Sequence, residues 1–265
     1  MRRKTAALVV LLIVIVAALS TAYLLFSSAP NYTTDVNRAT NYLAAGYDRS
    51  IGLVSETPGG QTYYVYSDNF LVAYVFDKSL NATLRTMASN ITSTDDRYLA
   101  KLHNPDNQYE VIASTNGTFF ASSDYTLAHM GSAVIKVTLN NGTGTLSPAD
   151  YADLAFLEAL YFHKVNGTGA AVQDFNLGMK LYDGTGFKDK AFNGTYQTYK
   201  LALCDYVGKV LGMSVPATVE SNLVRMQDAS GGFFTGYGPT FSTEGTTTNT
   251  ETTSLAILAL GTAKA

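Results

Sequence analysis

Acidic and aromatic side chains occur together in three stretches of this sequence, each close to an apolar run. The stretches contain Tyr66-Ser67-Asp68-Asn69, Asp183-Gly184-Thr185-Gly186-Phe187, and Asp228 with Gly231-Gly232-Phe233. Carboxylates can donate or accept protons, and aromatic rings give flat surfaces on which sugar rings can stack. This combination of residue types indicates a site that binds, and could cleave, a glycan.

The catalytic candidates are Asp68 and Glu251. Each comes at the start of an apolar, helix-forming run, so both would face one centre if the helices are arranged around it. Two facing carboxyl groups suffice for glycoside hydrolysis, in which one protonates the leaving oxygen and the other acts as nucleophile or activates water. The alternative is helix capping, since an acid in the first turn is stabilising by roughly 0.3 to 1 kcal/mol.

Nine further residues are candidates for substrate binding because they are acidic, amide or aromatic and lie near the same stretches. The alternatives are structural: Tyr residues at alternating positions are typical of a strand edge, and Asp beside Gly is typical of a turn. The candidates are Glu56, Tyr64, Tyr66, Asn69, Asp183, Phe187, Asp228, Phe233 and Tyr237.

Helical periodicity and capping signals predict the elements that would position these residues. Eight helices are expected, arranged as four hairpins. If consecutive helices are antiparallel, the four long connections 47–66, 92–146, 182–195 and 227–249 lie on one face. The expected helices are 34–47, 67–76, 80–90, 148–164, 169–181, 196–211, 216–226 and 250–264.

The pattern changes between 92 and 146, where a small β insertion is expected. Two runs, 109–113 and 133–139, are rich in β-branched and apolar residues, and Asn140-Asn141-Gly142 supplies a turn signal. The sequence therefore predicts a mainly α domain over 34–265 with one β insertion.

The repeated Gly-aromatic loop followed by a helix resembles the repeats of α/α-toroid proteins. Gln227–Phe233 followed by Asn249–Leu258 carries the resemblance, and 183–203 gives a weaker second copy. The superfamily includes terpene cyclases and protein prenyltransferases, and the resemblance implies a toroid of about four helical hairpins. The Asp-x-Asp-Asp motif of the cyclases and the Asp, Cys and His zinc set of the prenyltransferases are missing, so neither activity is expected.

The N-terminal residues indicate a membrane segment. Ala6–Phe26 contains no charged residue, follows Arg2-Arg3-Lys4, and as a helix would span roughly 31 Å, close to the bilayer core of about 30 Å. The positive-inside bias places residues 1–26 as a cytoplasmic tip and signal anchor, 27–33 as a linker and the rest outside the cytoplasm. A cleaved signal peptide is the alternative, given the small residues at 18–22.

Composition excludes several classes of partner and cofactor. The chain has 18 basic and 21 acidic residues, and three of the basic ones precede the apolar run, so the remainder carries about −6 and does not suit nucleic acid. The single Cys204 rules out an intrachain disulfide. Neither a metal site nor a cofactor is expected. Asn-x-Thr sequons, consistent with export and glycosylation, lie at Asn31, Asn81, Asn90, Asn116, Asn141, Asn166 and Asn193.

The sequence thus predicts a membrane-anchored extracytoplasmic domain that binds, and possibly hydrolyses, a polar polymer such as a glycan through its loop face. A noncatalytic surface or assembly protein that binds a protein partner is the alternative. An enzyme would need paired carboxyl groups in a cleft, whereas an interaction module needs only aromatic and amide groups on an open surface.

Overall fold

The computed structural model describes residues 31–262 apart from 61–62, 101, 103–104, 116–120 and 131–132. The expected membrane segment 6–26 and the sequon at Asn116 lie outside these residues. Within the described ranges, no helix combines the length and apolar character needed to cross a bilayer.

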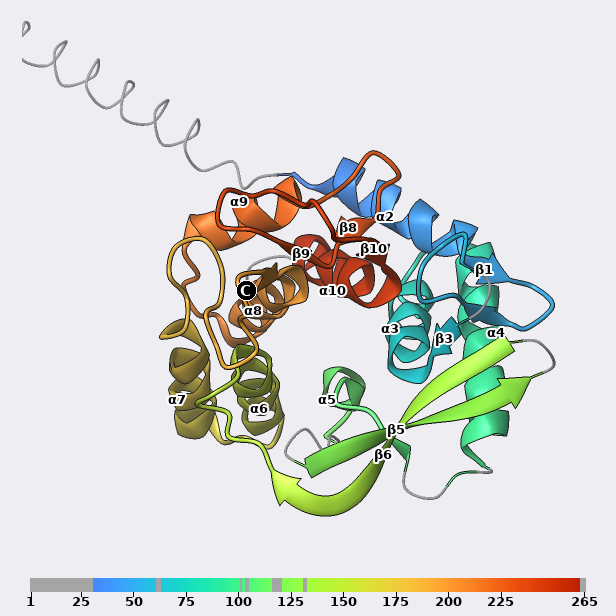
Figure 1. Cartoon of the computed structure of the whole chain (residues 1–265), viewed down its shortest axis with the longest axis horizontal. Coiled ribbons are helices and arrows are strands. Elements are labelled where there is room, and N and C mark those ends of the chain that lie inside the picture. The colour runs from blue at the N-terminus through green and yellow to red at the C-terminus, as the bar shows by residue number, and fades with distance from the viewer. Residues whose placement is uncertain are drawn as a thin grey trace, which may run out of the picture. The chain divides into compact units, whose positions relative to one another are not determined.

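Four apolar helices form the inside of the fold: α3 (Tyr66–Asp77), α6 (Ala152–Lys164), α8 (Thr198–Leu211) and α10 (Thr250–Gly261). They follow one another in space, since α10 contacts both α3 and α8, and α8 contacts α6 (Figure 1). In α8 and α10 almost every residue is buried. A helix that is apolar on all sides is stable only when other elements surround it, which explains this inner position.

Four other helices cover the inner ones on the outside. α2 (Thr33–Ala45) packs against α10, α4 (Ala82–Leu99) against α3, α7 (Thr168–Met179) against α6, and α9 (Ala217–Arg225) against α8. These helices bury one face each; α2, for example, buries Ala39, Tyr42 and Leu43. The amphipathic pattern matches this one-sided packing.

The strands are short except for one pair, and they form four separate sheets within the described residues. β6 (Ala133–Thr145) is the centre of the largest sheet: it pairs in parallel with β3 (Tyr63–Val65) and antiparallel with β4 (Pro105–Asp106) and β5 (Ala121–Met130). Three two-residue pairs are antiparallel: β1 (Tyr47–Asp48) with β2 (Leu53–Val54), β7 (Tyr196–Gln197) with β9 (Gly236–Tyr237), and β8 (Phe233–Phe234) with β10 (Thr248–Asn249).

The expected fold class is therefore wrong. About half of the described residues are helical and four small sheets accompany them, so the chain is not mainly α with one insertion. The plan of four consecutive hairpins also fails, because the described residues form nine helices and the first of these, α2, packs against the last, α10. The apolar face of α2 is buried by closing the chain on itself, a long-range contact that local periodicity does not encode.

The expected strand 109–113 is wrong as well. Glu110–Ala113 forms a short helix, α5, which buries Val111 and Ile112. Their β propensity is overridden because propensity for strands depends strongly on packing context. α4 also continues to Leu99, inside the range assigned to the insertion.

Two buried polar side chains connect the inner helices to their neighbours. Lys209 of α8 donates to Asp205 (2.7 Å), to Glu220 of α9 (2.9 Å) and to the carbonyl oxygen of Ala259 in α10 (2.7 Å). Asn69 of α3 is fully buried; its Oδ1 accepts from the Val54 amide (2.7 Å) and its Nδ2 donates to the carbonyl oxygens of Val54 and Val65 (both 3.0 Å).

We predict that Asn69→Ala lowers the free energy of unfolding by about 3 kcal/mol, because the buried Val54 amide and carbonyl lose their partner and are left unsatisfied. Urea denaturation followed by circular dichroism measures the change. Asn41→Ala, on the exposed side of α2, is the control and should change stability by less than about 0.5 kcal/mol. Equal effects of the two substitutions would contradict this role of Asn69.

Candidate functional site

A pocket of about 460 Å³ lies where α3 and α10 begin. Its walls come from segments that are distant in the sequence: the start of α3, the start of α10, the residues after β2, and β6. The lining residues are Glu56, Val65, Ser67, Asp68, Lys136, Asn249 and Glu251. The two residues predicted as a catalytic pair, Asp68 and Glu251, thus line one pocket.

Backbone hydrogen bonds hold Glu56 at this pocket. The Thr250 amide donates to the Glu56 carbonyl oxygen (2.9 Å), and the Thr250 hydroxyl donates to that of Ser55 (2.7 Å). The Glu56 amide donates to the carbonyl oxygen of Tyr63 in β3 (2.9 Å). Glu56 is therefore fixed between the strand that leads into α3 and the first residue of α10.

Lys136 reaches the pocket through the parallel pairing of β3 and β6, in which it is the register partner of Val65. Its Nζ lies 3.1 Å from Oε2 of Glu56 and 4.7 Å from the centre of the Tyr63 ring. The side chains of the ion pair are about one-third exposed (33% and 35%), so water screens the attraction and the pair contributes little stability. Among the described lining residues, Lys136 supplies the positive charge.

Asp68 is buried, with 4% of its surface exposed. Burial raises the pKa of its carboxyl group well above the ordinary value, and the negative charges of Glu251 and Glu56 raise it further. The Ser67 hydroxyl and Lys136 oppose this only in part. Asp68 is thus set to keep its proton.

Glu251 is half-buried among polar groups, and it has a closer hydrogen-bond donor than Asp68 has. Burial raises its pKa, the hydroxyl of Tyr109 at 2.6 Å from Oε1 lowers it, and the charges of Asp153 and Glu56 raise it again. A hydrogen bond with the Asn249 side chain lowers it too. Hydrogen bonds to a carboxylate favour its charged form. Of the two carboxyl groups, Glu251 is therefore the one that ionises first.

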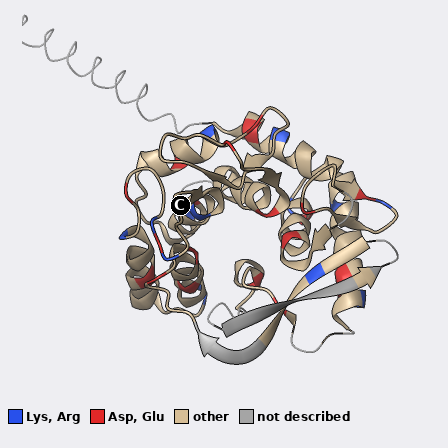
Figure 2. Cartoon of the chain, in the orientation of Figure 1, with Lys and Arg blue, Asp and Glu red and all other residues tan. Residues whose placement is uncertain are grey.

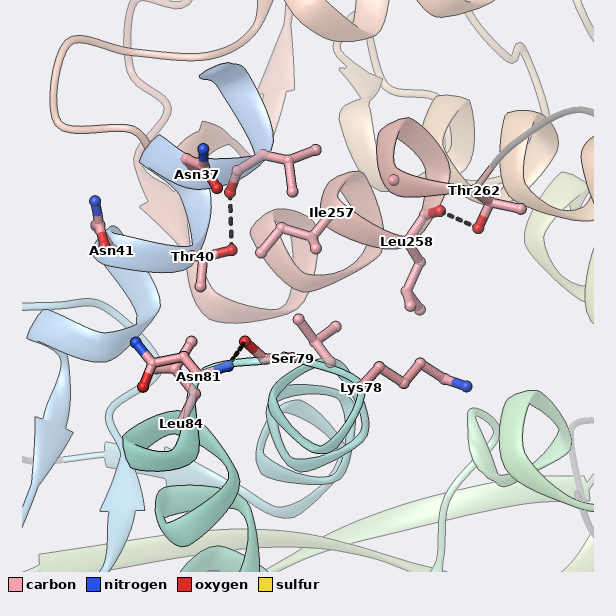
Figure 3. Close-up of a pocket in the computed structure, with 13 residues that line it drawn as sticks. Asn37, Thr40, Asn41, Lys78, Ser79, Asn81, Leu84, Ile257, Leu258 and Thr262 are labelled. Carbon is pink, nitrogen blue, oxygen red and sulfur yellow. Dashed lines mark hydrogen bonds between the residues drawn. The ribbon is translucent and has the colours of Figure 1, made fainter. Parts of the chain in front are cut away.

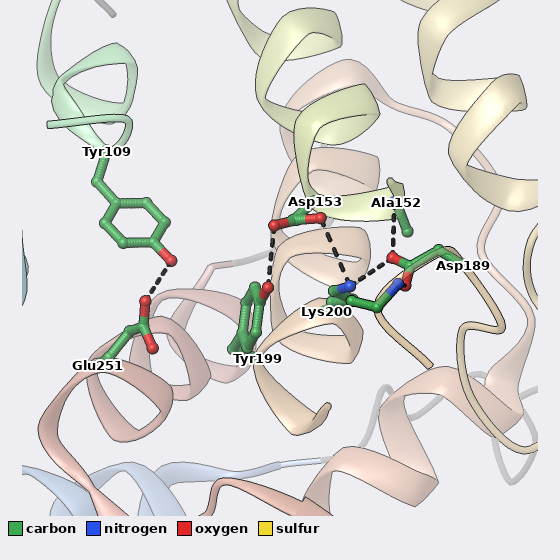
Figure 4. Close-up of polar contacts among 8 residues, drawn as sticks. Tyr109, Ala152, Asp153, Asp189, Tyr199, Lys200 and Glu251 are labelled. Atoms are coloured by element: carbon green, nitrogen blue, oxygen red, sulfur yellow. Dashed lines mark hydrogen bonds and ion pairs between the residues drawn. The ribbon is translucent and has the colours of Figure 1, made fainter. Parts of the chain in front are cut away.

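A second polar network lies beside Glu251, at the starts of α6 and α8 (Figure 4). The Tyr199 hydroxyl donates to Oδ2 of Asp153 (2.9 Å), and Oδ1 of Asp153 lies 3.6 Å from the Nζ of buried Lys200. Lys200 also contacts Asp189, whose Oδ2 accepts from the amide of Ala152 (3.0 Å). Figure 2 shows where the charged residues lie, with acidic segments on α3, α6 and α10 and a basic segment on β6.

Three of the sequence candidates, Asp68, Glu251 and Glu56, line the pocket, and three close neighbours do not. Tyr64 is fully buried and its hydroxyl donates to Asp48 (3.2 Å), while the Tyr66 hydroxyl donates to Glu110 (3.2 Å). Asn69 binds backbone groups, as described above. These three residues stabilise the segments on either side of the pocket.

The candidates from the two later loops lie in packed or turn positions. Asp183 is a turn residue: Oδ1 accepts from the amides of Thr185 (2.9 Å) and Gly186 (3.1 Å), and Oδ2 from the hydroxyl of Tyr196 (2.6 Å). Asp228 accepts from the Ser230 amide (2.6 Å) in a similar turn. The rings of Phe187, Phe233 and Tyr237 are buried in the core, and the Tyr237 hydroxyl donates to the carbonyl oxygen of Thr185 (2.8 Å).

Asp68 is not the N-cap residue of α3, although it is an acid in the first turn of that helix. α3 begins at Tyr66 after Val65, which makes no side-chain capping bond, so Asp68 lies inside the first turn. At α10 the capping group is Asn249, whose Oδ1 accepts from the Thr252 amide (2.9 Å). Glu251 is therefore an acid in the first turn of α10 and not its N-cap residue, and it lines the pocket.

Sequence reasoning missed several polar residues of this region. Lys136 lies in the predicted strand 133–139. Its charge beside the apolar residues Ile135 and Val137 is the feature of the sequence that could have marked it as a site residue. The sequence pattern predicts a strand that begins at Tyr109, but this residue directly precedes the short helix α5. Asp153 and Lys200 gave no signal, because a charge at the start of a helix is common on any exposed surface.

Another pocket, of about 560 Å³, lies between α2, α3, α4 and α10 (Figure 3). Its floor is apolar, with Val75, Leu84 and Ile257, and its rim carries amide and hydroxyl groups. Lys78 is the charged residue among those that line it. This pocket offers van der Waals contact and hydrogen bonds but has no carboxyl group for proton transfer.

Comparisons with known proteins give this chain no relative: no family model, no curated protein and no solved structure matches it. Within the described residues, no three acidic, histidine or cysteine side chains are placed to hold a metal ion together. The pocket with Asp68 and Glu251 is therefore the feature of this chain that bears on its function.

We predict that Asp68→Asn makes the protein more stable than the unsubstituted chain at neutral pH. The raised pKa of Asp68 means that the folded state binds more protons than the unfolded state above about pH 4, so ionisation of Asp68 lowers stability as pH rises. An Asn does not ionise, so the stability difference should increase with pH. Thermal unfolding at a series of pH values measures it.

Asp183→Asn is the matched comparison, and its expected effect on stability has the opposite sign to that of Asp68→Asn. Burial raises the pKa of Asp183, but hydrogen bonds from Tyr196, Lys188 and two backbone amides lower it overall, so its charge stabilises the fold. That stability is present above the ordinary pKa of Asp and is lost as pH falls through the lowered value. Asp183→Asn should be less stable than the unsubstituted chain at neutral pH, with the gap closing in acid. The same sign for both variants would contradict the assignment.

Proposed function

We propose that this protein hydrolyses a glycosidic bond of a polar glycan, with Asp68 and Glu251 as the pair of catalytic carboxyl groups. The observation that supports the proposal is their presence in one pocket, where the negative charge of Glu251 helps Asp68 to keep its proton. Two titratable groups whose surroundings separate their proton affinities can serve as acid and base at the same pH.

The surroundings assign the two roles. Asp68 has two acidic neighbours and few hydrogen-bond donors, so it keeps its proton and is the general acid that protonates the leaving oxygen. Glu251 accepts hydrogen bonds, so it ionises first and is the nucleophile or the base that activates water. The pocket's volume of about 460 Å³ is within the range of small-molecule sites.

The rim of the pocket supplies binding groups for sugar hydroxyls. The ion pair of Glu56 and Lys136 offers both acceptors and donors, and the Tyr63 ring beside Lys136 is 45% exposed, which leaves a face for stacking. Asn249 adds an amide. These groups would orient a sugar ring over the two carboxyl groups.

The test is a screen of the purified full-length chain against a panel of soluble oligosaccharides, with products followed by mass spectrometry. Asp68→Asn and Glu251→Gln should each reduce turnover by about 10²-fold or more, because each removes proton transfer or nucleophilic attack. Circular dichroism spectra should stay unchanged. Glu244→Gln, on an exposed loop, is the control and should retain full turnover.

Other outcomes discriminate among the alternatives. Binding without released products would overturn hydrolysis and leave a glycan-recognition protein. The absence of both binding and turnover across the panel would overturn the proposal and favour a protein partner. Turnover that survives both substitutions would place the chemistry elsewhere in the chain.

A further inference from the structure

Behind Glu251 lies a tyrosine that does not line the pocket. Tyr109 is fully buried, and its hydroxyl lies 2.6 Å from Oε1 of Glu251. Burial and the charge of Glu251 raise the pKa of Tyr109 well above its ordinary value, so the phenol stays neutral and acts as the donor in this bond. The contact joins two segments that are remote in the sequence, the region of α5 and the start of α10.

The position of Tyr109 is fixed from two sides. Its own amide donates to Oδ1 of Asn107 (3.0 Å), which sets the turn before α5. On the other side, the Nζ of Lys164 at the end of α6 donates to the carbonyl oxygen of Ile112 (2.8 Å), which ties α5 to α6. The Tyr109 hydroxyl is thus held on elements other than the one that carries Glu251.

We propose that Tyr109 is a positioning residue for Glu251: its hydroxyl fixes the Glu251 carboxylate and keeps it ionised, so that Asp68, and not Glu251, carries the proton. This inference rests on the proposed hydrolase function and deepens it. A charge-assisted hydrogen bond of this length stabilises the carboxylate more than the carboxylic acid. The bond therefore separates the roles of two carboxyl groups that would otherwise compete for one proton.

Tyr199 supplies a close comparison within the same region. Its hydroxyl also donates to a carboxylate, but that carboxylate is Oδ2 of Asp153 and not Glu251 (2.9 Å) (Figure 4). Burial and the charge of Asp153 raise the pKa of Tyr199 as well. A Tyr→Phe substitution at either position removes one hydrogen bond from a phenol to a carboxylate. Only the substitution at Tyr109 removes a hydrogen bond to Glu251 itself.

Other charged or titratable side chains lie around Glu251 and its neighbours. They come from the segment after β2, from α3, β6, α6 and α8, and a Tyr→Phe substitution at position 109 removes none of them. These groups are Glu56, Asp68, Lys136, Asp153, Tyr199 and Lys200.

The first test is the pH dependence of kcat/KM on whichever oligosaccharide the chain cleaves. In Tyr109→Phe, Glu251 should remain protonated to higher pH, so the acid limb should move to higher pH and kcat/KM on that limb should fall about tenfold. Tyr199→Phe should leave the acid limb in place. A profile for Tyr109→Phe that coincides with that of the unsubstituted chain, or an equal shift in Tyr199→Phe, would overturn the proposal.

The second test needs no turnover. Side-chain carboxyl carbons of ¹³C-labelled glutamate are followed by NMR as pH changes, and Glu251→Gln identifies the signal of Glu251. Its titration midpoint should rise in Tyr109→Phe and stay in place in Tyr199→Phe; an unchanged midpoint in Tyr109→Phe would overturn the positioning role. A raised midpoint in a protein that cleaves no glycan would support the control of Glu251 by Tyr109 and overturn the hydrolase function alone.

Discussion

The pocket depends on one short connection, the residues Val54 to Glu56, which bind both inner helices that contribute to it. Asn69 of α3 holds both backbone groups of Val54, and Thr250 at the start of α10 holds the carbonyl oxygens of Ser55 and Glu56. Because the backbone groups of a buried segment must be paired, these bonds fix where α3 and α10 begin relative to each other. Asp68 and Glu251 are brought into one pocket as a result.

Burying several carboxyl groups in the same region costs desolvation free energy. Positively charged partners offset this cost for some of these groups and not for others. Lys136 pairs with Glu56, and Lys200 pairs with Asp153 and Asp189, whereas Asp68 has no cation of its own in the described contacts. A buried carboxyl group with neither a cation nor a close hydrogen-bond donor keeps its proton, and Glu251 differs from Asp68 because the Tyr109 hydroxyl donates to it. The unequal distribution of partners, and not the mere presence of acids, gives the pocket its capacity for acid and base chemistry.

Much of the local structure could be predicted from the sequence. The caps and apolar runs located most helices to within a few residues: α8 covers Thr198–Leu211 where 196–211 is expected, and α9 covers Ala217–Arg225 where 216–226 is expected. The exception is α4, which continues to Leu99 where an end at 90 is expected. The strand at 133–139 is part of β6. The fold class failed because short two-residue strands leave no periodic signal, and because a run of β-branched residues at 111–112 is helical once buried.

The sequence by itself determined which residue types are available for chemistry. It also determined that Asp68 and Glu251 lie in the first turns of helices, because capping and apolar periodicity are local properties. Tertiary structure alone decided which acids meet. It placed Glu56 and Lys136 beside Asp68 through strand pairing and long-range backbone bonds, and it put the Tyr109 hydroxyl against Glu251. Proton affinity depends on burial and on neighbours from distant segments, and these exist only once the chain has folded.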